Sequence, residues 1–394
     1  MNPSPFEIYR LRRNPFPPAA TGIDIEDNLW MPPSWKAKVD KYFNELSAGD
    51  GVKAFPIIGD YGSGKTVLLQ GYLKRFFDDK RIKSFYFENP GVQFYDLANN
   101  LLRTLGRYEF SKALWELCKL HLRPRVQTTL FPLTFEEMLS QLKTKDDREG
   151  KARELSRILK NNLGITDDEE ISYRLASMVI ETKNRPYFEY REFIAGQKGS
   201  LVAEKAEHKY FKAIIKSIIT IYSVEGVAFL IDEFEDIAIP KRMPRNKSYE
   251  YLATLRHLID ISETENLWIA IAMTQEAAEA SKAMNPPLWE RFTHSETNAL
   301  SLDPLTGNDA KELIIWWLNR AREPERSLFP FSEDFISLLE QRPDIRLPRS
   351  IVKLCFFAIS KAIQDKMQPP ISKDFLKSII DEMYPMPKET NHEK

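Results

Sequence analysis

The feature that most constrains this chain is the segment GDYGSGKT at positions 59–66. It matches the pattern G-x-x-x-x-G-K-[ST] through Gly59, Gly64, Lys65 and Thr66. The chain has only 15 glycines in 394 residues, and three of them stand within this short segment. Glycine allows backbone conformations in which several amide groups surround one phosphate. The pattern therefore predicts a phosphate-binding loop, in which Lys65 reaches the β and γ phosphates and Thr66 ligates Mg²⁺.

The sequence on both sides of this segment predicts a strand before the loop and a helix after it. Residues 55–58 are apolar, as in a buried strand, and apolar residues recur at helical spacing from Leu68 to Phe76. A loop between strand and helix places bound phosphate at the helix N-terminus, where amide groups and the helix dipole favour an anion. The residues expected to contact the nucleotide here are Gly59, Asp60, Tyr61, Gly62, Ser63, Gly64, Lys65, Thr66 and Val67.

A second apolar segment, residues 227–231, leads directly into acidic residues. An unbroken apolar run is typical of a central strand of a parallel sheet, and such sheets bind ligands at the carboxyl ends of their strands. We expect Asp232 to hold Mg²⁺ through water and Glu233 to polarise the attacking water. Glu235 and Asp236 are interpreted as solvated acids at the start of a helix, where the helix dipole favours them.

A third apolar segment, residues 267–273, ends in Thr274. We expect this strand to lie beside the strand that precedes Asp232, so that the Thr274 hydroxyl can orient water against the γ phosphate. The alternative is a threonine that only terminates the strand, since threonine is common in strands.

Two arginines are candidates for contacts with the γ phosphate. Arg291 ends a short helical segment just before residues 299–302, which are expected to form a fifth strand. An arginine at this place can act on the site of a neighbouring subunit, and the alternative is an ordinary surface arginine. Arg349 follows a proline at the start of a helix, which suits a first helical turn. From a small helical lid, Arg349 could reach the γ phosphate.

The charge balance gives no long-range attraction to polyanions, because 56 basic residues offset 57 acidic ones. A nucleic acid would have to meet a local patch, and the candidate is a loop that contains Lys241, Arg242, Arg245 and Lys247. A loop that is basic only for solubility is the alternative. No apolar segment is long enough to span a bilayer, so we expect a cytoplasmic protein without membrane association.

The cysteines and histidines predict neither a disulfide nor a metal centre. Cys118 and Cys355 lie far apart in apolar segments, which is typical of buried reduced thiols. The five histidines show no spacing that would ligate a metal.

The part of the chain between Lys65 and Asp232 is longer than two strands and two helices require, which predicts an insertion over residues 107–210. Its charged, helical pattern includes residues 143–162, interpreted as an exposed helix-loop-helix. An insertion of this kind can determine which partner is bound, and a passive helical cap over the core is the alternative.

In this order, the segments GDYGSGKT, FLIDE, AMTQ, WERF and LPRS resemble the AAA+ ATPases. Within that superfamily the chain is most similar to the initiator-type branch, which includes origin-recognition-like ATPases, transposition-regulator ATPases and the ATP-binding proteins of bacteriophage-exclusion systems. The similarity includes the Asn14-Pro15-Phe16 motif and covers about residues 6–106 and 210–385. It implies ATP and Mg²⁺ bound between the subunits of a homo-oligomer, and a protein partner such as a nuclease or a transposase. The settings that it implies are DNA transactions or antiviral defence against phage.

These observations predict a three-layer α/β P-loop NTPase with a parallel sheet, a helical insertion and a C-terminal helical lid. The expected divisions are residues 1–106 and 211–303 for the nucleotide-binding domain, 107–210 for the insertion, 304–385 for the lid and 386–394 for a polar tail. ATP hydrolysis to ADP and phosphate is the expected reaction. Two other functions share the motifs: a signalling switch that holds nucleotide as a scaffold with little turnover, and a small-molecule kinase. A kinase would not need Glu233, Thr274 and Arg291 together.

Overall fold

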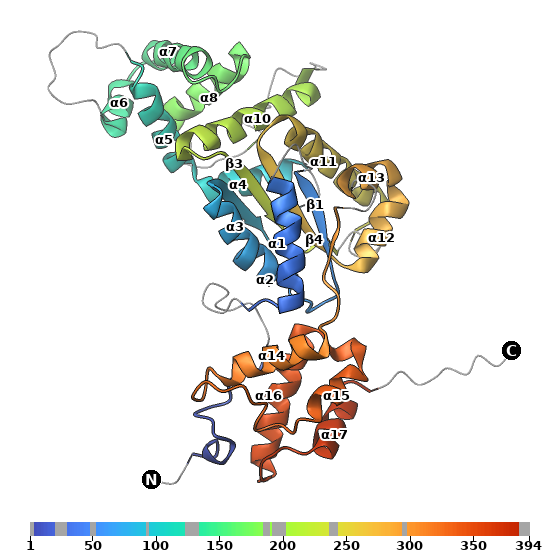
Figure 1. Ribbon diagram of the computed structural model, residues 1–394. Coiled ribbons are helices and arrows are strands. Elements are labelled where there is room, and N and C mark those ends of the chain that lie inside the picture. The colour runs from blue at the N-terminus through green and yellow to red at the C-terminus, as the bar shows by residue number, and fades with distance from the viewer. Residues whose placement is uncertain are drawn as a thin grey trace.

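The computed structural model describes most of the chain, and the ranges that it describes are residues 4–19, 30–47, 53–91, 94–122, 134–183, 190, 202–235, 243–293 and 298–385. Within these ranges the chain forms a five-strand parallel sheet, helices that pack on both faces of the sheet, and a helical C-terminal region (Figure 1). The prediction of an α/β fold with a parallel sheet is therefore confirmed.

The sheet has the strand order β2-β3-β4-β1-β5, and every neighbouring pair is parallel. Its strands are β1 (Ala54–Ile58), β2 (Ile82–Phe87), β3 (Gly226–Ile231), β4 (Leu267–Met273) and β5 (Leu300–Ser301). Ile58 pairs with Met273, and Ile231 pairs with Ile271. Because β4 lies between β1 and β3, the residues that follow these three strands lie at one edge of the sheet. The prediction that Thr274 follows a strand beside the Asp232 strand is confirmed.

The helical segment after the phosphate-binding loop covers one face of the sheet together with α1 (Pro33–Ser47). This segment is continuous and consists of α2 (Lys65–Val67), the π-helix η2 (Leu68–Leu73) and α3 (Lys74–Asp79). Leu69 and Phe77 pack with Val39 of α1 against the apolar side chains of the sheet. The helix expected after the loop is therefore present. Its π-helical turn is of a kind that occurs often near functional sites.

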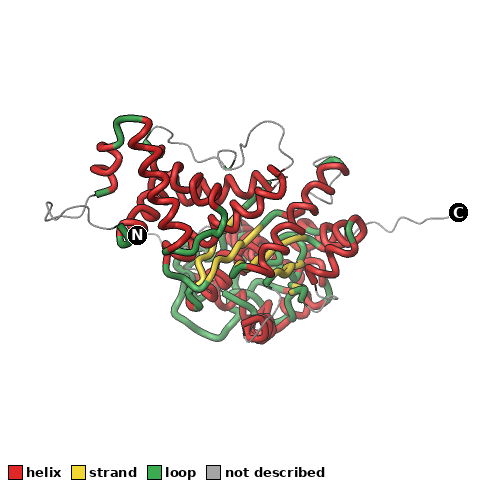
Figure 2. The backbone as a smooth tube through the Cα atoms, turned by 90° about the horizontal axis from the view of Figure 1, so that it is seen from above, coloured by secondary structure: helices red, strands yellow, loops and turns green. Residues whose placement is uncertain are grey.

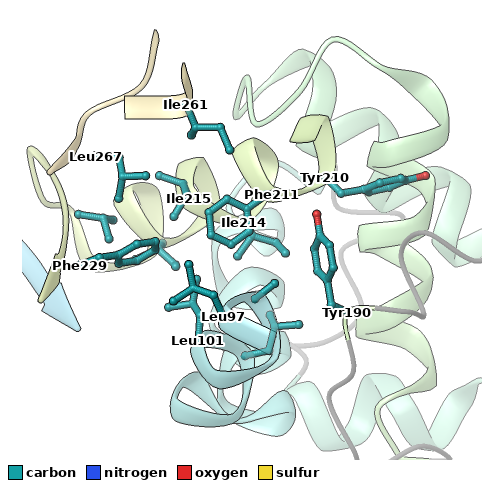
Figure 3. Packing of buried hydrophobic residues seen from close by; sticks show 14 of the residues in the cluster. Leu97, Leu101, Tyr190, Tyr210, Phe211, Ile214, Ile215, Phe229, Ile261 and Leu267 are labelled. Carbon is teal, nitrogen blue, oxygen red and sulfur yellow. The ribbon is translucent and has the colours of Figure 1, made fainter. Parts of the chain in front are cut away.

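In the part of the chain that the structure describes, helices also cover the opposite face, and Figure 2 shows the strands lying between helices when the molecule is seen from above. They are α4 (Phe94–Leu105), α10 (Val202–Tyr222), α11 (Arg245–Thr264), α12 (Gln275–Met284) and α13 (Pro286–Thr293). Phe211 of α10 packs against Phe229 of β3 with ring centroids 6.0 Å apart. Leu97 and Leu101 of α4 complete this contact (Figure 3). Burying these large apolar side chains anchors α10 on the sheet.

The residues between α4 and α10 form further helices that share a core with the sheet. They are α5 (Arg107–Lys119), α6 (Phe135–Gln141), α7 (Lys145–Asn161) and α8 (Glu169–Glu181). The expectation of a helix-loop-helix over residues 143–162 is wrong, because this stretch forms the single helix α7. Thr144 and Asp147 cap its start reciprocally, and Gly150 is accommodated within it. A glycine inside a helix lowers stability without ending the helix.

The C-terminal helices form a bundle, and the first residues of the chain pack into its core (Figure 1). The bundle consists of α14 (Gly307–Leu318), α15 (Phe335–Glu340), η4 (Pro343–Ile345), α16 (Pro348–Gln364) and α17 (Lys373–Met383), joined by the N-terminal turn η1 (Glu7–Tyr9). The Tyr9 hydroxyl donates to the carbonyl of Met367 at 2.7 Å. Asn14 donates from Nδ2 to the carbonyl of Phe356 at 3.1 Å, and Phe16 is 2% exposed. The Asn14-Pro15-Phe16 motif is thus part of the bundle.

In the described residues, two segments connect the bundle with the sheet. The first passage leads into α1, where Trp35 packs against the bundle core and also against the core on one face of the sheet. The second passage leads from β5 into α14. The Ser34 hydroxyl at the start of α1 donates to Oδ2 of Asp309 in α14 at 2.6 Å, and Asp309 is 2% exposed. A partly buried hydrogen bond therefore joins the two passages.

Both cysteines are buried free thiols, as expected. Burial raises the pKa of Cys118 to about 12 and raises the pKa of Cys355 well above its usual value. Both therefore stay protonated at neutral pH. Among the described residues, no helix has both the length and the apolar character needed to cross a bilayer.

Candidate functional site

The segment GDYGSGKT forms the predicted loop between β1 and α2, at the carboxyl end of the sheet. The Gly59 amide donates to the carbonyl of Met273 at 3.1 Å, which fixes the start of the loop beside the end of β4. Gly62 and Gly64 have φ angles of 82° and 100°, which residues with a Cβ rarely adopt. The backbone of the loop therefore favours glycine at position 64, which belongs to the pattern, and at position 62, which does not.

The Lys65 ammonium is buried within the loop and has three acceptors. Nζ donates to the carbonyl of Gly59 at 2.8 Å and to the carbonyl of Asp60 at 3.3 Å. It also forms an ion pair with Oε1 of Glu235 at 3.3 Å. The Lys65 and Glu235 side chains are only 8% and 10% exposed. The ring of Tyr61, an exposed residue, lies 5.6 Å from the ammonium. The Glu235 carboxylate is therefore the negatively charged partner of this ammonium.

The interpretation of Glu235 as a solvated acid is wrong, because its side chain is buried against Lys65. The reason lies in the turn after β3, where Glu233 has a φ of 52°. Phe234 then points into the core and stacks on Tyr251, with ring centroids 4.6 Å apart. The next side chain, Glu235, turns toward the loop. Asp236, the other acid of this interpretation, lies outside the described residues.

Thr66 and Asp232, the two predicted Mg²⁺ ligands, are brought together. The Thr66 hydroxyl donates to Oδ2 of Asp232 at 2.6 Å, and the Tyr86 hydroxyl donates to the same oxygen at 3.0 Å. The Glu233 amide donates to the other carboxylate oxygen at 3.0 Å. Burial and the negative charge of Asp232 raise the pKa of Tyr86, so that its hydroxyl stays a donor. Tyr86 was not expected in the site, and its only signal is a polar side chain near the end of β2.

The oxygen atoms of Thr66 and Asp232 fit the chemistry of Mg²⁺, which prefers oxygen ligands and keeps several waters or phosphates. In the part of the chain that the structure describes, no three histidine, cysteine, aspartate or glutamate side chains gather around one point. The two side chains would therefore hold Mg²⁺ only together with phosphate and water. This arrangement suits a nucleotide site better than a structural metal site.

The loop also fits a phosphate-bearing ligand. The Ser63 side chain is fully buried, and its Oγ has no hydrogen-bond partner among the described residues. A buried hydroxyl without a partner is costly unless a ligand supplies one. A Cβ at Gly59 would lie 2.6 Å from that Oγ, so the loop has no room for a side chain at this position. Backbone amides, a lysine and a hydroxyl are the donors that phosphate requires.

Thr274 and Glu233 lie at the ends of β4 and β3, where the sequence placed them. Thr274 is 6% exposed, and its Oγ1 accepts a hydrogen bond from the Ala277 amide at 3.2 Å, which caps α12. A hydroxyl that accepts a bond can still donate its own proton. The Glu233 side chain is exposed at the edge of the site.

The two candidate arginines lie on different parts of the molecule. Arg349 is in the first turn of α16, as predicted, and its amide donates to the Gly62 carbonyl at 3.2 Å. The C-terminal bundle therefore touches the phosphate-binding loop. Arg291 is on α13 and forms an ion pair with Asp260 of α11 at 3.1 Å, with side chains 51% and 46% exposed.

The basic segment is only partly described. Lys241 and Arg242 lie outside the described residues. Arg245 and Lys247 are in the first turn of α11, so their interpretation as loop residues is wrong. Pro244 precedes the helix with a φ of −56°, which suits a helix start. Lys247 forms an ion pair with Glu250 at 2.7 Å, one helical turn further on.

Substituting Gly62 with alanine should destabilise the protein by about 1 to 3 kcal/mol. A Cβ on this backbone would lie 2.7 Å from the Cβ of Arg349, in addition to the cost of a positive φ. Urea unfolding measures the effect. The control is Gly150→Ala in α7, where no atom lies within 4 Å of the added Cβ and alanine should raise stability. Equal effects of the two substitutions would contradict the described loop.

Comparisons with models of known protein families, with curated proteins and with solved structures find no match for this chain.

Proposed function

We propose that this chain is an ATPase of the AAA+ type, closest to the initiator branch. The observation that carries the proposal is the meeting of two separate motifs at one edge of the sheet. Thr66 of the phosphate-binding loop and Asp232 of the acidic segment are 166 positions apart and share a 2.6 Å hydrogen bond. The loop, the acids and Thr274 follow three adjacent parallel strands, which is where such sheets bind ligands.

Each residue has a distinct task in the proposed reaction. Lys65 and the loop amides bind the phosphates, and Lys65 stabilises the charge that develops on the transferred group. Mg²⁺, when bound by Thr66 and Asp232, would neutralise charge on the phosphate oxygens. Glu233 accepts a proton from the attacking water, and Thr274 orients that water. Water as the acceptor makes the reaction a hydrolysis of ATP to ADP and phosphate.

The proposed assembly is a homo-oligomer with ATP bound between subunits. Arg291 then acts on the site of a neighbouring chain, and the C-terminal bundle serves as a lid that brings Arg349 to the γ phosphate. The exposed ion pair between Arg291 and Asp260 supports this, because such a pair is worth at most about 1 kcal/mol and is readily released. The insertion helices would select a protein partner such as a nuclease or transposase. DNA transactions or phage defence are the proposed settings.

ATP turnover per chain, measured against protein concentration with and without duplex DNA, tests this proposal. We expect turnover to rise with concentration, since neighbouring chains complete the site, and to rise further with DNA. Arg291→Ala should lower turnover by about 10³-fold at high concentration. The control Arg153→Ala removes a surface arginine that pairs with Glu149 in α7, and it should leave ATP turnover unchanged. ATP turnover per chain that does not depend on protein concentration would contradict a site shared between neighbouring chains.

A switch that holds nucleotide with little turnover is the second candidate. The observed site suits it as well as it suits an ATPase, because a site made of Lys65, Thr66 and Asp232 would bind nucleotide whether or not Glu233 then activates water. Nucleotide that remains bound through purification, together with negligible phosphate release, would support this candidate over an ATPase.

A further inference from the structure

Glu235 holds a position at Lys65 that a phosphate needs. The ammonium has three hydrogens, and its three acceptors are the Gly59 and Asp60 carbonyls and the Glu235 carboxylate. Only the carboxylate is charged, and only the carboxylate is on a side chain that can turn away. A phosphate that binds Lys65 must therefore displace Glu235 or share the ammonium with it.

We propose that Glu235 is an inhibitory residue, which competes with the phosphates of a nucleotide for Lys65 and so lowers the affinity of the site for both ATP and ADP. The inference rests on the proposed ATPase function. Lysine in a loop of this kind reaches the β and γ phosphates. ATP and ADP both bring a β phosphate to Lys65, so each of them has to displace the Glu235 carboxylate from the ammonium or share the ammonium with it.

Burial makes this competition strong. The Lys65 and Glu235 side chains are 8% and 10% exposed, so their attraction is screened much less than that of a surface pair. A displaced Glu235 carboxylate also stays on the turn that carries Asp232 and Glu233, whose negative charges oppose its burial there. The consequence for the reaction is that Glu235 competes with bound ADP for Lys65, which promotes release of ADP.

Calorimetric titration of the full chain with ADP, and with the non-hydrolysable β,γ-imido analogue of ATP, tests the inference in the presence of Mg²⁺. Glu235→Gln keeps the shape of the side chain and removes its charge. We expect this variant to bind ADP and the ATP analogue each about tenfold more tightly than the wild type does, because neither nucleotide then has to break the ion pair.

A matched control removes a carboxylate from an exposed ion pair. Glu333→Gln removes the negative charge from the 3.2 Å ion pair of Glu333 with Lys311, two residues far from the loop in sequence, and should leave both affinities unchanged. Glu235→Ala, which removes the carboxylate altogether, should also tighten the binding of both nucleotides.

The outcomes separate the inference from the proposed function. If Glu235→Gln weakens the binding of both nucleotides, Glu235 supports binding and does not compete with it, and the inference is overturned. A wild-type chain that binds neither nucleotide would overturn the proposed function, and the inference with it. Wild-type binding that Glu235→Gln leaves unchanged would overturn the inference alone.

Discussion

Replacing Lys65 with alanine should weaken nucleotide binding by at least about 100-fold and also destabilise the nucleotide-free protein by about 3 kcal/mol. Binding is lost because the charged donor to the phosphates is removed. Stability is lost because Glu235 stays buried without the cation that is 3.3 Å from it in the structure. Titration calorimetry with the ATP analogue measures the first effect, and urea unfolding without nucleotide measures the second.

Two further variants separate these effects. Lys65→Ala combined with Glu235→Gln should recover much of the lost stability, since no charge remains buried, but should not recover binding. Lys53→Ala is the control lysine at the opposite end of β1, where its ammonium contacts the carbonyl of Glu265 at 3.2 Å. It should retain wild-type affinity. A Lys65→Ala variant as stable as the wild type would contradict a buried ion pair with Glu235.

Glu233→Gln should lower the rate of ATP hydrolysis by about 10² to 10⁴-fold and leave binding of the ATP analogue within about threefold of the wild type. Glutamine has the same shape and cannot accept a proton from water at neutral pH. Glu233 has a φ of 52°, which is a strained backbone conformation. Glutamine is close to glutamate in size and shape, so this substitution adds no further strain to the turn. Single-turnover phosphate release measures the chemical step directly.

The control for Glu233 lies at the other end of the same strand. Glu225 precedes β3 and forms an ion pair with Arg81 in which both side chains are 65% exposed. Glu225→Gln should hydrolyse ATP at the wild-type rate. If Glu233→Gln also does so while ATP remains bound, another group activates the water, and the role proposed for Glu233 is wrong.

The strands of the candidate site were predictable because a central strand of a parallel sheet is buried on both faces. Such a strand is apolar throughout, and its ends are marked by the first polar residue. Residues 267–273 were predicted and form β4, while the prediction 227–231 differs from β3 by one residue. The strand expected over residues 299–302 is shorter, at Leu300–Ser301, because only these residues pair with β1.

The environment of individual acids was not predictable in the same way. Three acidic residues with similar side chains follow β3 closely in sequence, yet Asp232 and Glu235 are buried and Glu233 is exposed. This difference depends on one positive φ angle at Glu233, which no hydrophobic pattern encodes. The partner of Glu235 is also distant in the chain, so its burial is a tertiary property.

The position of the N-terminal segment in the fold also could not be predicted from the sequence pattern. Asn14 donates to the carbonyl of Phe356 across 342 positions of the chain. Phe16 packs with its ring centroid 6.3 Å from those of Trp317 and Phe331. Contacts between residues so far apart in the chain depend on how the helices of the bundle pack together. Hydrophobic periodicity gives information only about residues that are near each other in sequence.

The hydrogen bond between Ser34 and Asp309 is one of the contacts that fix the position of the bundle relative to the sheet. Among the described residues, the chain crosses between the two parts at two places, and this bond ties the crossings together within one small region. Arg349 adds another contact between the bundle and the sheet, because its amide donates to the carbonyl of Gly62 in the phosphate-binding loop. A change in the backbone of the loop at Gly62 would therefore be felt directly at the first turn of α16.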